Sequence, residues 1–221
     1  MRRVITFLAL CLAISCGVES PRPESQEQVL AALKEGNARF VEGEMSYPHT
    51  SLDYTQTLSS GQSPFATVVA CSDSRVPVEF IFDQGFGDIF VIRNAGNTVL
   101  DKVSLGSVEY SVNHLDVNTV VVLGHTSCGA VTGVVMAGDS NHHIHGDENV
   151  TLLLDHIAEH ISQHKGTNEN LDQAILDNIN VQVDALMLSE NIKSRVEAGE
   201  LQILPALYDI STGGVTFLTA E

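Results

Sequence analysis

The sequence predicts an α/β fold: a mainly parallel β-sheet flanked by helices, with an N-terminal helical arm and an antiparallel hairpin at one edge of the sheet. Three apolar runs rich in β-branched residues are nearly continuous rather than alternating, which is typical of strands covered on both faces. A helical pattern separates the second run from the third, and strand, helix, strand with short connections favours parallel pairing. The three runs cover residues 65–70, 89–92 and 119–123.

The first helices have clear sequence signals. Ser25 followed by Gln28 forms a capping box, which predicts that the helical arm starts at this point. Between the second and third strands, residues 104–115 place their apolar side chains on one helical stripe, and Tyr110 falls on the opposite side. We therefore expect the second helix to cover the sheet with its apolar stripe.

The second half of the chain adds more helices and the closing hairpin. The last helical segment is expected to break near Ser189. A strand at 201–209, a Gly-containing turn and a strand at 215–218 predict the antiparallel hairpin. The segments with helical patterns are 130–137, 151–164 and 168–196.

The N-terminal segment has the pattern of a secretory leader. A short basic start precedes an apolar stretch over residues 4–14, which is too short to cross a bilayer as a helix. The stretch Leu-Ala-Ile-Ser-Cys ending at Cys16 resembles the lipobox of bacterial lipoproteins, although Leu is usual where Ala13 stands. We expect a signal peptide at 1–15 and a lipid on Cys16, with ordinary signal-peptidase cleavage as the alternative.

These features predict an exported bacterial protein of the periplasm or cell envelope. A tether at 16–24 would precede one domain at 25–221, because the chain has no internal repeat. The net charge of −17 argues against nucleic acid and anionic lipid surfaces as partners. We therefore expect membrane contact only through the N-terminal lipid.

A polar cluster follows the first strand, in the stretch "TVVACSDSRVP". Cys71, Asp73 and Arg75 stand at every second position, so in extended geometry they would leave the same face of the sheet. Such a cluster is costly to bury without partners. If the Arg75 guanidinium donates two hydrogen bonds to the Asp73 carboxylate, it would keep that carboxylate ionised and oriented.

A second cluster follows the third strand, in "VVVLGHTSCGAV". His125 and Cys128 have a spacing at which both side chains can reach one metal ion, and they share with Cys71 the carboxyl end of a parallel strand. Two thiolates and one imidazole suit Zn²⁺, with Asp73 or a water in the fourth position. An open position would make zinc-bound hydroxide available near neutral pH.

The two cysteines of the folded part also allow other interpretations. Export to an oxidising compartment favours a disulfide between Cys71 and Cys128, and both could instead be ordinary buried thiols. A disulfide, however, would leave His125, Asp73 and Arg75 without a role.

The motifs "CSDSR" and "HTSCGA" resemble those of the β-class carbonic anhydrases, and the likeness continues to "ALYDISTG" near the C-terminus. The resemblance implies that Cys71, His125 and Cys128 bind zinc and that Asp73 and Arg75 form the catalytic dyad. It implies a zinc lyase that reversibly hydrates carbon dioxide to bicarbonate and a proton.

The resemblance also implies a substrate site shared between subunits. Gln62 looks like the glutamine that hydrogen-bonds the substrate, and Phe90 and Tyr110 resemble the wall of the pocket. Because these groups come partly from a second subunit in the family, a homodimer or higher homo-oligomer is implied. Val68 stands where one branch of the family has Trp, so we expect the open, water-bound form of zinc rather than a form closed by Asp73.

Two further features are interpreted from the residues alone. Gly129 starts a helix, whose free N–H groups can hold bicarbonate, although simple packing also explains a glycine there. The loop "NHHIHGDEN" is expected to be a solvated connection, with a proton shuttle through its histidines as the alternative. Those histidines are His142, His143 and His145.

Two other functions remain open. The same site could hydrolyse carbon disulfide or carbonyl sulfide, which are also small, linear and apolar. A non-catalytic surface adhesin or zinc-storage lipoprotein would need the metal ligands but neither the dyad nor Gln62.

Overall fold

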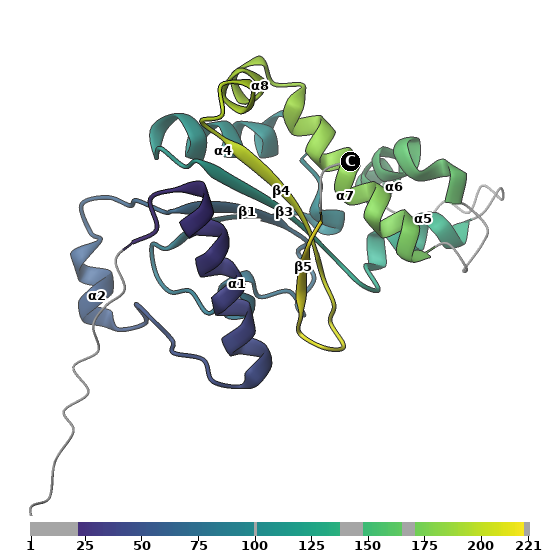
Figure 1. Cartoon of the computed structure of the whole chain (residues 1–221). Coiled ribbons are helices and arrows are strands. Elements are labelled where there is room, and N and C mark those ends of the chain that lie inside the picture. The colour runs from purple at the N-terminus through teal and green to yellow at the C-terminus, as the bar shows by residue number, and fades with distance from the viewer. Residues whose placement is uncertain (1–21, 100, 138–147, 165–170, 219–221) are drawn as a thin grey trace, which may run out of the picture.

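The computed structural model describes residues 22–99, 101–137, 148–164 and 171–218. A five-stranded sheet in the order β2-β1-β3-β4-β5 forms its centre (Figure 1). The first four strands in that order are parallel, and β5 runs antiparallel to β4, so the predicted sheet and edge hairpin are confirmed. The strands are β1 (Ala66–Ala70), β2 (Ile89–Arg93), β3 (Thr119–His125), β4 (Gln202–Tyr208) and β5 (Val215–Phe217).

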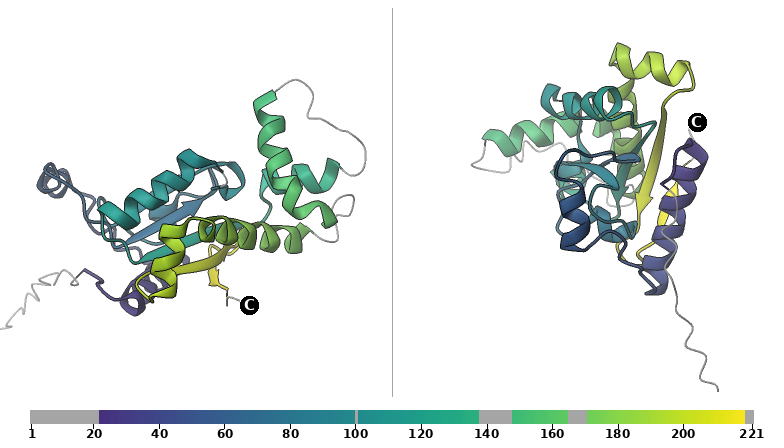
Figure 2. Two further views of the ribbon diagram at one scale, coloured as in Figure 1. Left: turned by 90° about the horizontal axis from the view of Figure 1, so that it is seen from above. Right: turned by 90° about the vertical axis from the view of Figure 1, so that its left-hand side faces the viewer.

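Helices cover both faces of the sheet (Figure 2). The buried side chains of β1 and β3 alternate between the two faces: Val69 and Val122 join the core under α4 to α8, whereas Val68 and Leu123 join the core under α1 and α3. The helices are α1 (Gln26–Glu42), α2 (Leu52–Thr57), α3 (Val78–Ile81), α4 (Lys102–His114), α5 (Gly129–Ala137), α6 (Glu148–Ile161), α7 (Leu171–Met187) and α8 (Glu190–Glu197), with 3₁₀ turns η1 (Ala95–Asn97) and η2 (Ser162–His164).

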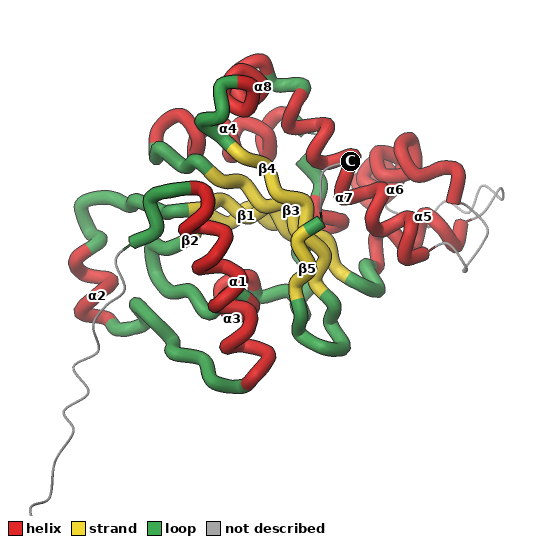
Figure 3. Tube along the Cα trace, viewed as in Figure 1, coloured by secondary structure: helices red, strands yellow, loops and turns green. Residues whose placement is uncertain are grey.

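The N-terminal helix α1 is fixed to the domain at several points. The predicted capping box is present, because the Gln28 N–H donates to Ser25 Oγ over 3.2 Å and the Gln28 side chain accepts from the Ser25 N–H over 3.1 Å. Further along the helix, the buried Asn37 donates to the carbonyls of Ile81 and Gly213. The arm therefore packs against α3 and the hairpin turn, as Figure 3 shows.

The structure differs from the prediction in two places and confirms it in a third. The short helices α2 and α3 were not expected, because neither is long enough to show a helical period. Strand β2 is only partly buried, since it forms one edge of the sheet in this chain. The expected break near Ser189 is confirmed: α7 ends at Met187, and the Ser189 side chain caps α8.

The expected leader, the lipidated Cys16 and most of the predicted tether lie outside the described residues. Within the ranges that the structure describes, every helix is too short or too polar to cross a membrane.

Candidate metal centre

Three potential metal ligands meet at the carboxyl edge of two neighbouring strands. Cys71 directly follows β1, His125 is the last residue of β3, and Cys128 precedes α5. Because β1 and β3 pair in parallel, with Ala70 opposite Leu123, their ends lie together. The ligand atoms of the three side chains all lie within 4.8 Å of one another, and all three residues are buried. The two cysteines are free rather than joined by a disulfide.

The imidazole of His125 is oriented for metal binding. Its Nδ1 lies 3.0 Å from the carbonyl oxygen of Thr126, so Nδ1 carries the proton and donates it to that carbonyl. The other nitrogen, Nε2, is buried and has no hydrogen-bond partner among the described residues. A buried nitrogen without a partner is costly, and a cation beside it would use its lone pair. The residues therefore fit a metal ion.

The two thiols differ in their hydrogen bonds. The Cys71 sulfur accepts hydrogen bonds from the backbone N–H of Gly96 over 3.3 Å and of Asp73 over 3.4 Å. A hydrogen bond from Cys128 is the main cause that lowers the pKa of Cys71 to about 4, against the opposing effect of burial. The same contact, with burial, raises the pKa of Cys128. A cation at this position would favour thiolates at both sulfurs.

Asp73 and Arg75 form a bidentate ion pair beside this cluster. Arg75 donates from Nε to Asp73 Oδ1 over 2.9 Å and from Nη2 to Oδ2 over 2.7 Å. These hydrogen bonds hold the pKa of Asp73 well below its usual range, and the nearby His125 adds to the effect. Asp73 therefore stays ionised throughout the neutral pH range.

The predicted contact is present, but the geometric reason given for it was wrong. Strand β1 ends at Ala70, so the segment from Cys71 to Arg75 is not extended. Instead the chain turns, and the backbone N–H of Arg75 donates to Asp73 Oδ1 over 2.9 Å. This local turn, and not a shared face of a strand, brings the guanidinium to the carboxylate.

Asp73 lies next to the three ligands without joining them. The group of mutually close ligand atoms contains Cys71, His125 and Cys128 but not Asp73. The nearer carboxylate oxygen is 3.9 Å from His125 Nε2, and both oxygens are held by Arg75. This arrangement agrees with a centre of three protein ligands and an open fourth position.

The predicted substrate residues lie in two different places. Gly129 starts α5 next to Cys128, and a Cβ built on it would meet nothing within 4 Å. Gln62, in contrast, precedes β1 and is exposed at the end of the strand opposite to Cys71. Phe90 pairs with Thr67 near the start of β1, and its ring centroid is 6.3 Å from that of Tyr110. A single chain therefore does not bring these three residues to the metal cluster.

Two residues that hold the site were missed in the sequence. Arg93, at the end of β2, donates to the carbonyl of Cys71 over 3.0 Å and to that of Asp73 over 2.6 Å. Gly96 follows in η1 and donates to the Cys71 sulfur. Both stand in "RNAGN" at the carboxyl end of a predicted strand, so the rule that located Cys71 and His125 would have located them too. The candidate shuttle residues His142, His143 and His145 lie outside the described part of the chain.

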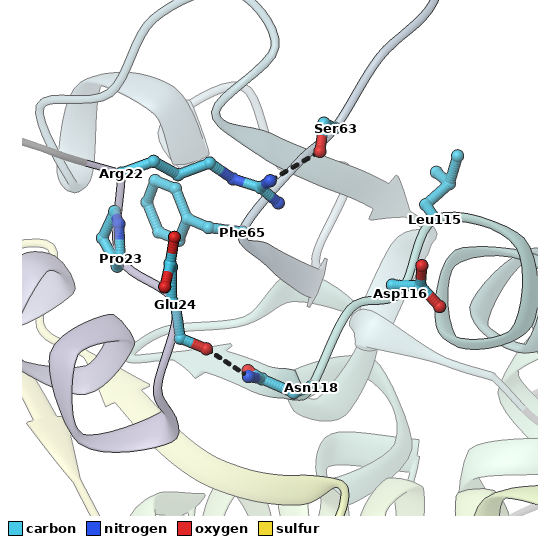
Figure 4. A pocket seen from close by; sticks show the side chains of 8 residues that line it. All are labelled: Arg22, Pro23, Glu24, Ser63, Phe65, Leu115, Asp116 and Asn118. Atoms are coloured by element: carbon cyan, nitrogen blue, oxygen red, sulfur yellow. Dashed lines mark hydrogen bonds between the residues drawn. The ribbon is translucent and has the colours of Figure 1, made fainter.

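A small cavity of about 240 Å³ lies away from the cluster, before the first residues of β1 and β3 (Figure 4). In it the Arg22 guanidinium donates to Ser63 Oγ and to the carbonyl of Pro64, and the Asn118 side chain donates to the carbonyl of Glu24. Residues 22–24, at the end of the predicted tether, are thus in contact with the domain.

The fold and the site together define an α/β protein with a two-cysteine, one-histidine centre at the carboxyl edge of a parallel sheet. A family model described as carbonic anhydrase matches residues 66–215, which include the three potential ligands together with Asp73 and Arg75. The chain belongs to this family, and its fold matches that of the β-carbonic anhydrases.

Comparison with known proteins gives the same assignment. The chain is 54% identical over 106 residues to carbonic anhydrase 2 of Mycobacterium tuberculosis, an alignment that covers 48% of this chain and 51% of that protein. The chain thus spans about half the length of that curated relative. It is 39% identical over 186 residues to a carbonic anhydrase of Mycolicibacterium smegmatis, covering 83% and 89% of the two chains.

A solved structure extends the likeness to three dimensions. A tetrameric β-carbonic anhydrase of the filamentous ascomycete Sordaria macrospora superimposes with a TM-score of 0.64 at 27% identity, covering 88% of this chain and 98% of that one.

Proposed function

We propose that the protein is a zinc-dependent carbonic anhydrase that reversibly hydrates carbon dioxide to bicarbonate and a proton. The observation that carries this proposal is the buried His125 Nε2, which faces two buried cysteines and has no hydrogen-bond partner in the described chain. Two thiolates and one imidazole are ligands that zinc prefers. Family membership supports the same reaction.

Cys71, His125 and Cys128 would hold the ion. When bound, zinc supplies a Lewis acid that makes a water molecule nucleophilic near neutral pH. The remaining chemistry belongs to side chains and backbone of the protein. The Arg75 guanidinium keeps the Asp73 carboxylate ionised and directed toward the cluster, and this carboxylate accepts a hydrogen bond from the attacking water.

The substrate oxygens need donors, and the chain offers two. The backbone N–H of Gly129 stands at the N-terminus of α5, where the helix dipole favours the negative charge that develops on the substrate. Gln62 would supply a side-chain amide. Since Gln62 lies at the far end of β1, its amide would act on the site of another subunit.

We therefore propose a homodimer or higher homo-oligomer. Phe90 lies on the edge strand β2, and Tyr110 is 48% exposed beside it. The tetrameric state of the Sordaria macrospora relative supports assembly of this kind. In such an assembly Phe90 and Tyr110 would line the apolar wall of the partner's site.

We also propose export through the N-terminal leader, with a lipid on Cys16 as the anchor to the cell envelope. Fractionation of cells that express the full chain and a Cys16→Ser variant tests this. Wild-type protein in the membrane fraction and variant protein in the soluble fraction support the anchor. Membrane retention of the variant contradicts it.

The reaction is tested by stopped-flow hydration of carbon dioxide on the purified mature protein, with zinc content measured on the same sample and on Cys128→Ser. We expect one zinc per chain and rapid hydration in the wild type, and the loss of both in the variant. Full zinc without hydration would contradict the proposed reaction. Assays with carbon disulfide and carbonyl sulfide on that sample would then separate a hydrolase from a non-catalytic zinc protein.

A further inference from the structure

Two buried amides on α7 face the strand ends that carry the metal centre. Asn178 is 1% exposed and Gln182 is 0% exposed, and they lie one helical turn apart on the side of α7 that packs against β3 and η1. Amide side chains are rarely this buried unless their polar groups have partners. The hydrogen-bond partners of Asn178 and Gln182 therefore show which segment of the chain these two amides fix.

Both amides bind the segment that begins at η1. Asn178 Nδ2 donates to the carbonyl of Gly96 over 2.9 Å. Gln182 Oε1 accepts from the backbone N–H of Val99 over 2.9 Å, and Gln182 Nε2 donates to Asn178 Oδ1 over 3.3 Å. The amides thus support each other and fix both ends of residues 96–99 to α7.

The fixed segment in turn contacts a predicted metal ligand. The N–H of Gly96 donates to Cys71 Sγ over 3.3 Å, while its carbonyl accepts from Asn178. Gly96 has a φ of +69°, and a Cβ at this position would lie 2.7 Å from Ile157 Cδ1. The positive φ favours glycine at this position. Because Gly96 is bonded through both its N–H and its carbonyl, the segment cannot move away without breaking contacts on both sides.

We propose that Asn178 and Gln182 are positioning residues of the metal centre, which hold the Gly96 N–H on the Cys71 sulfur and thereby set zinc affinity and the electron density of that thiolate. This inference rests on the proposed function, because it takes Cys71 as a metal ligand. A hydrogen bond to a thiolate draws charge from the sulfur and fixes its direction, which is how groups outside the coordination shell tune a metal site.

The test replaces Asn178 with leucine, which has a similar size and cannot donate. Zinc affinity is measured by competition with a chelator, and the cobalt-substituted protein is examined for its thiolate-to-metal charge-transfer band. We expect Asn178→Leu to weaken zinc binding by about 10-fold to 100-fold, the usual effect of losing an outer-shell partner. The band should move to longer wavelength, because the sulfur becomes more electron-rich.

Ser111→Ala is the matched control for lost stability. Ser111 is also fully buried, and its hydroxyl accepts from Thr67 Oγ1 over 2.7 Å, away from the metal ligands. We expect this variant to lower the melting temperature without changing zinc affinity or the cobalt band. Equal changes in Ser111→Ala and Asn178→Leu would overturn the inference, since the effect would then follow stability alone.

A milder variant decides the matter if Asn178→Leu does not fold. Gln182→Met retains the volume of the side chain but removes the acceptor for the Val99 N–H and the donor to Asn178. We expect a band shift in the same direction and a smaller loss of affinity. An unchanged band and affinity in this variant, with a wild-type protein that binds both metals, would overturn the inference and leave the proposed function intact. A wild-type protein that binds neither metal would instead overturn the proposed function.

Discussion

Two groups of predicted site residues differ in whether a single chain brings their members together. At the carboxyl edge of β1 and β3, the three ligands are buried and within 4.8 Å of one another. At the edge strand β2, Phe90 and Tyr110 contact each other away from these ligands, and Gln62 is exposed. One chain therefore brings together the proposed metal ligands but not the proposed substrate wall.

The separation follows from the register of the strands. Phe90 pairs with Thr67, which stands four residues before Cys71. At about 3.3 Å per residue, this places the ring roughly 13 Å along the strand from the cluster. An uncovered edge strand also presents unpaired backbone groups that favour association with another chain. Burial therefore distinguishes the residues that one chain brings together from those that lie apart within it.

The largest expected effect comes from replacing one of the three proposed metal ligands. His125→Asn should abolish stoichiometric zinc binding and lower turnover by more than about 100-fold. This loss exceeds the loss of about 10-fold to 100-fold that is usual when a residue outside the coordination shell is replaced. Zinc analysis and stopped-flow hydration on one preparation would measure both. Stoichiometric zinc in the variant would mean that His125 is not a ligand.

The dyad should affect the reaction without removing the metal. Asp73→Asn keeps the shape of the side chain but removes the charge that Arg75 holds, so we expect turnover to fall by about 100-fold with unchanged zinc. The measurements are kcat and zinc content across neutral pH. A variant that loses zinc in proportion to activity would place Asp73 among the ligands instead.

A smaller effect is expected from the substrate wall. Gln62→Ala removes one hydrogen bond to substrate, which at about 1.4 kcal/mol corresponds to a roughly 10-fold loss in kcat/KM. Zinc content and the cobalt spectrum should stay as in the wild type, because Gln62 lies at the far end of β1. Loss of metal in this variant would contradict the separation of the two regions.

The smallest expected effect is on stability in acid. The pKa of Asp73 is lowered in the folded state, chiefly by hydrogen bonds from Arg75, so its pairing stabilises the fold fully above the ordinary carboxyl pKa of about 3.9. That contribution is lost as the pH falls toward the lowered value. Urea unfolding should give the same difference between wild type and Asp73→Asn from pH 6 to 8, and a smaller one below about pH 4. A difference that grows in acid would contradict the pairing.

The cluster of potential metal ligands was predictable because the positions of Cys71 and His125 follow from a general rule. The carboxyl ends of parallel strands meet at one edge, and Cys71 and His125 stand at two such ends. The buried strands were equally clear, since β1 and β3 are apolar throughout. The sheet order and the partly exposed β2 were not, because one apolar run does not indicate whether its strand is central or at an edge.

The supporting residues were harder to recognise for a different reason. Asn178 and Gln182 are polar positions on a helix, and without tertiary contacts such residues resemble a solvated face. Besides their bond to each other, it is the close approach of α7 to η1 and the residues after it that gives them partners. Similarly, the turn that brings Arg75 to Asp73 depends on local backbone geometry, which the alternating sequence pattern did not indicate.

The most direct test of the account uses mixed dimers of two inactive or weakened variants, Cys128→Ser and Gln62→Ala, purified through two different tags. If one chain supplies the metal and its partner supplies Gln62, one of the two sites in each mixed dimer has every wild-type residue, and kcat/KM per dimer should reach about half that of the wild type. A kcat/KM no higher than the mean of the two parent variants would show that Gln62 does not act across the interface and would contradict the account.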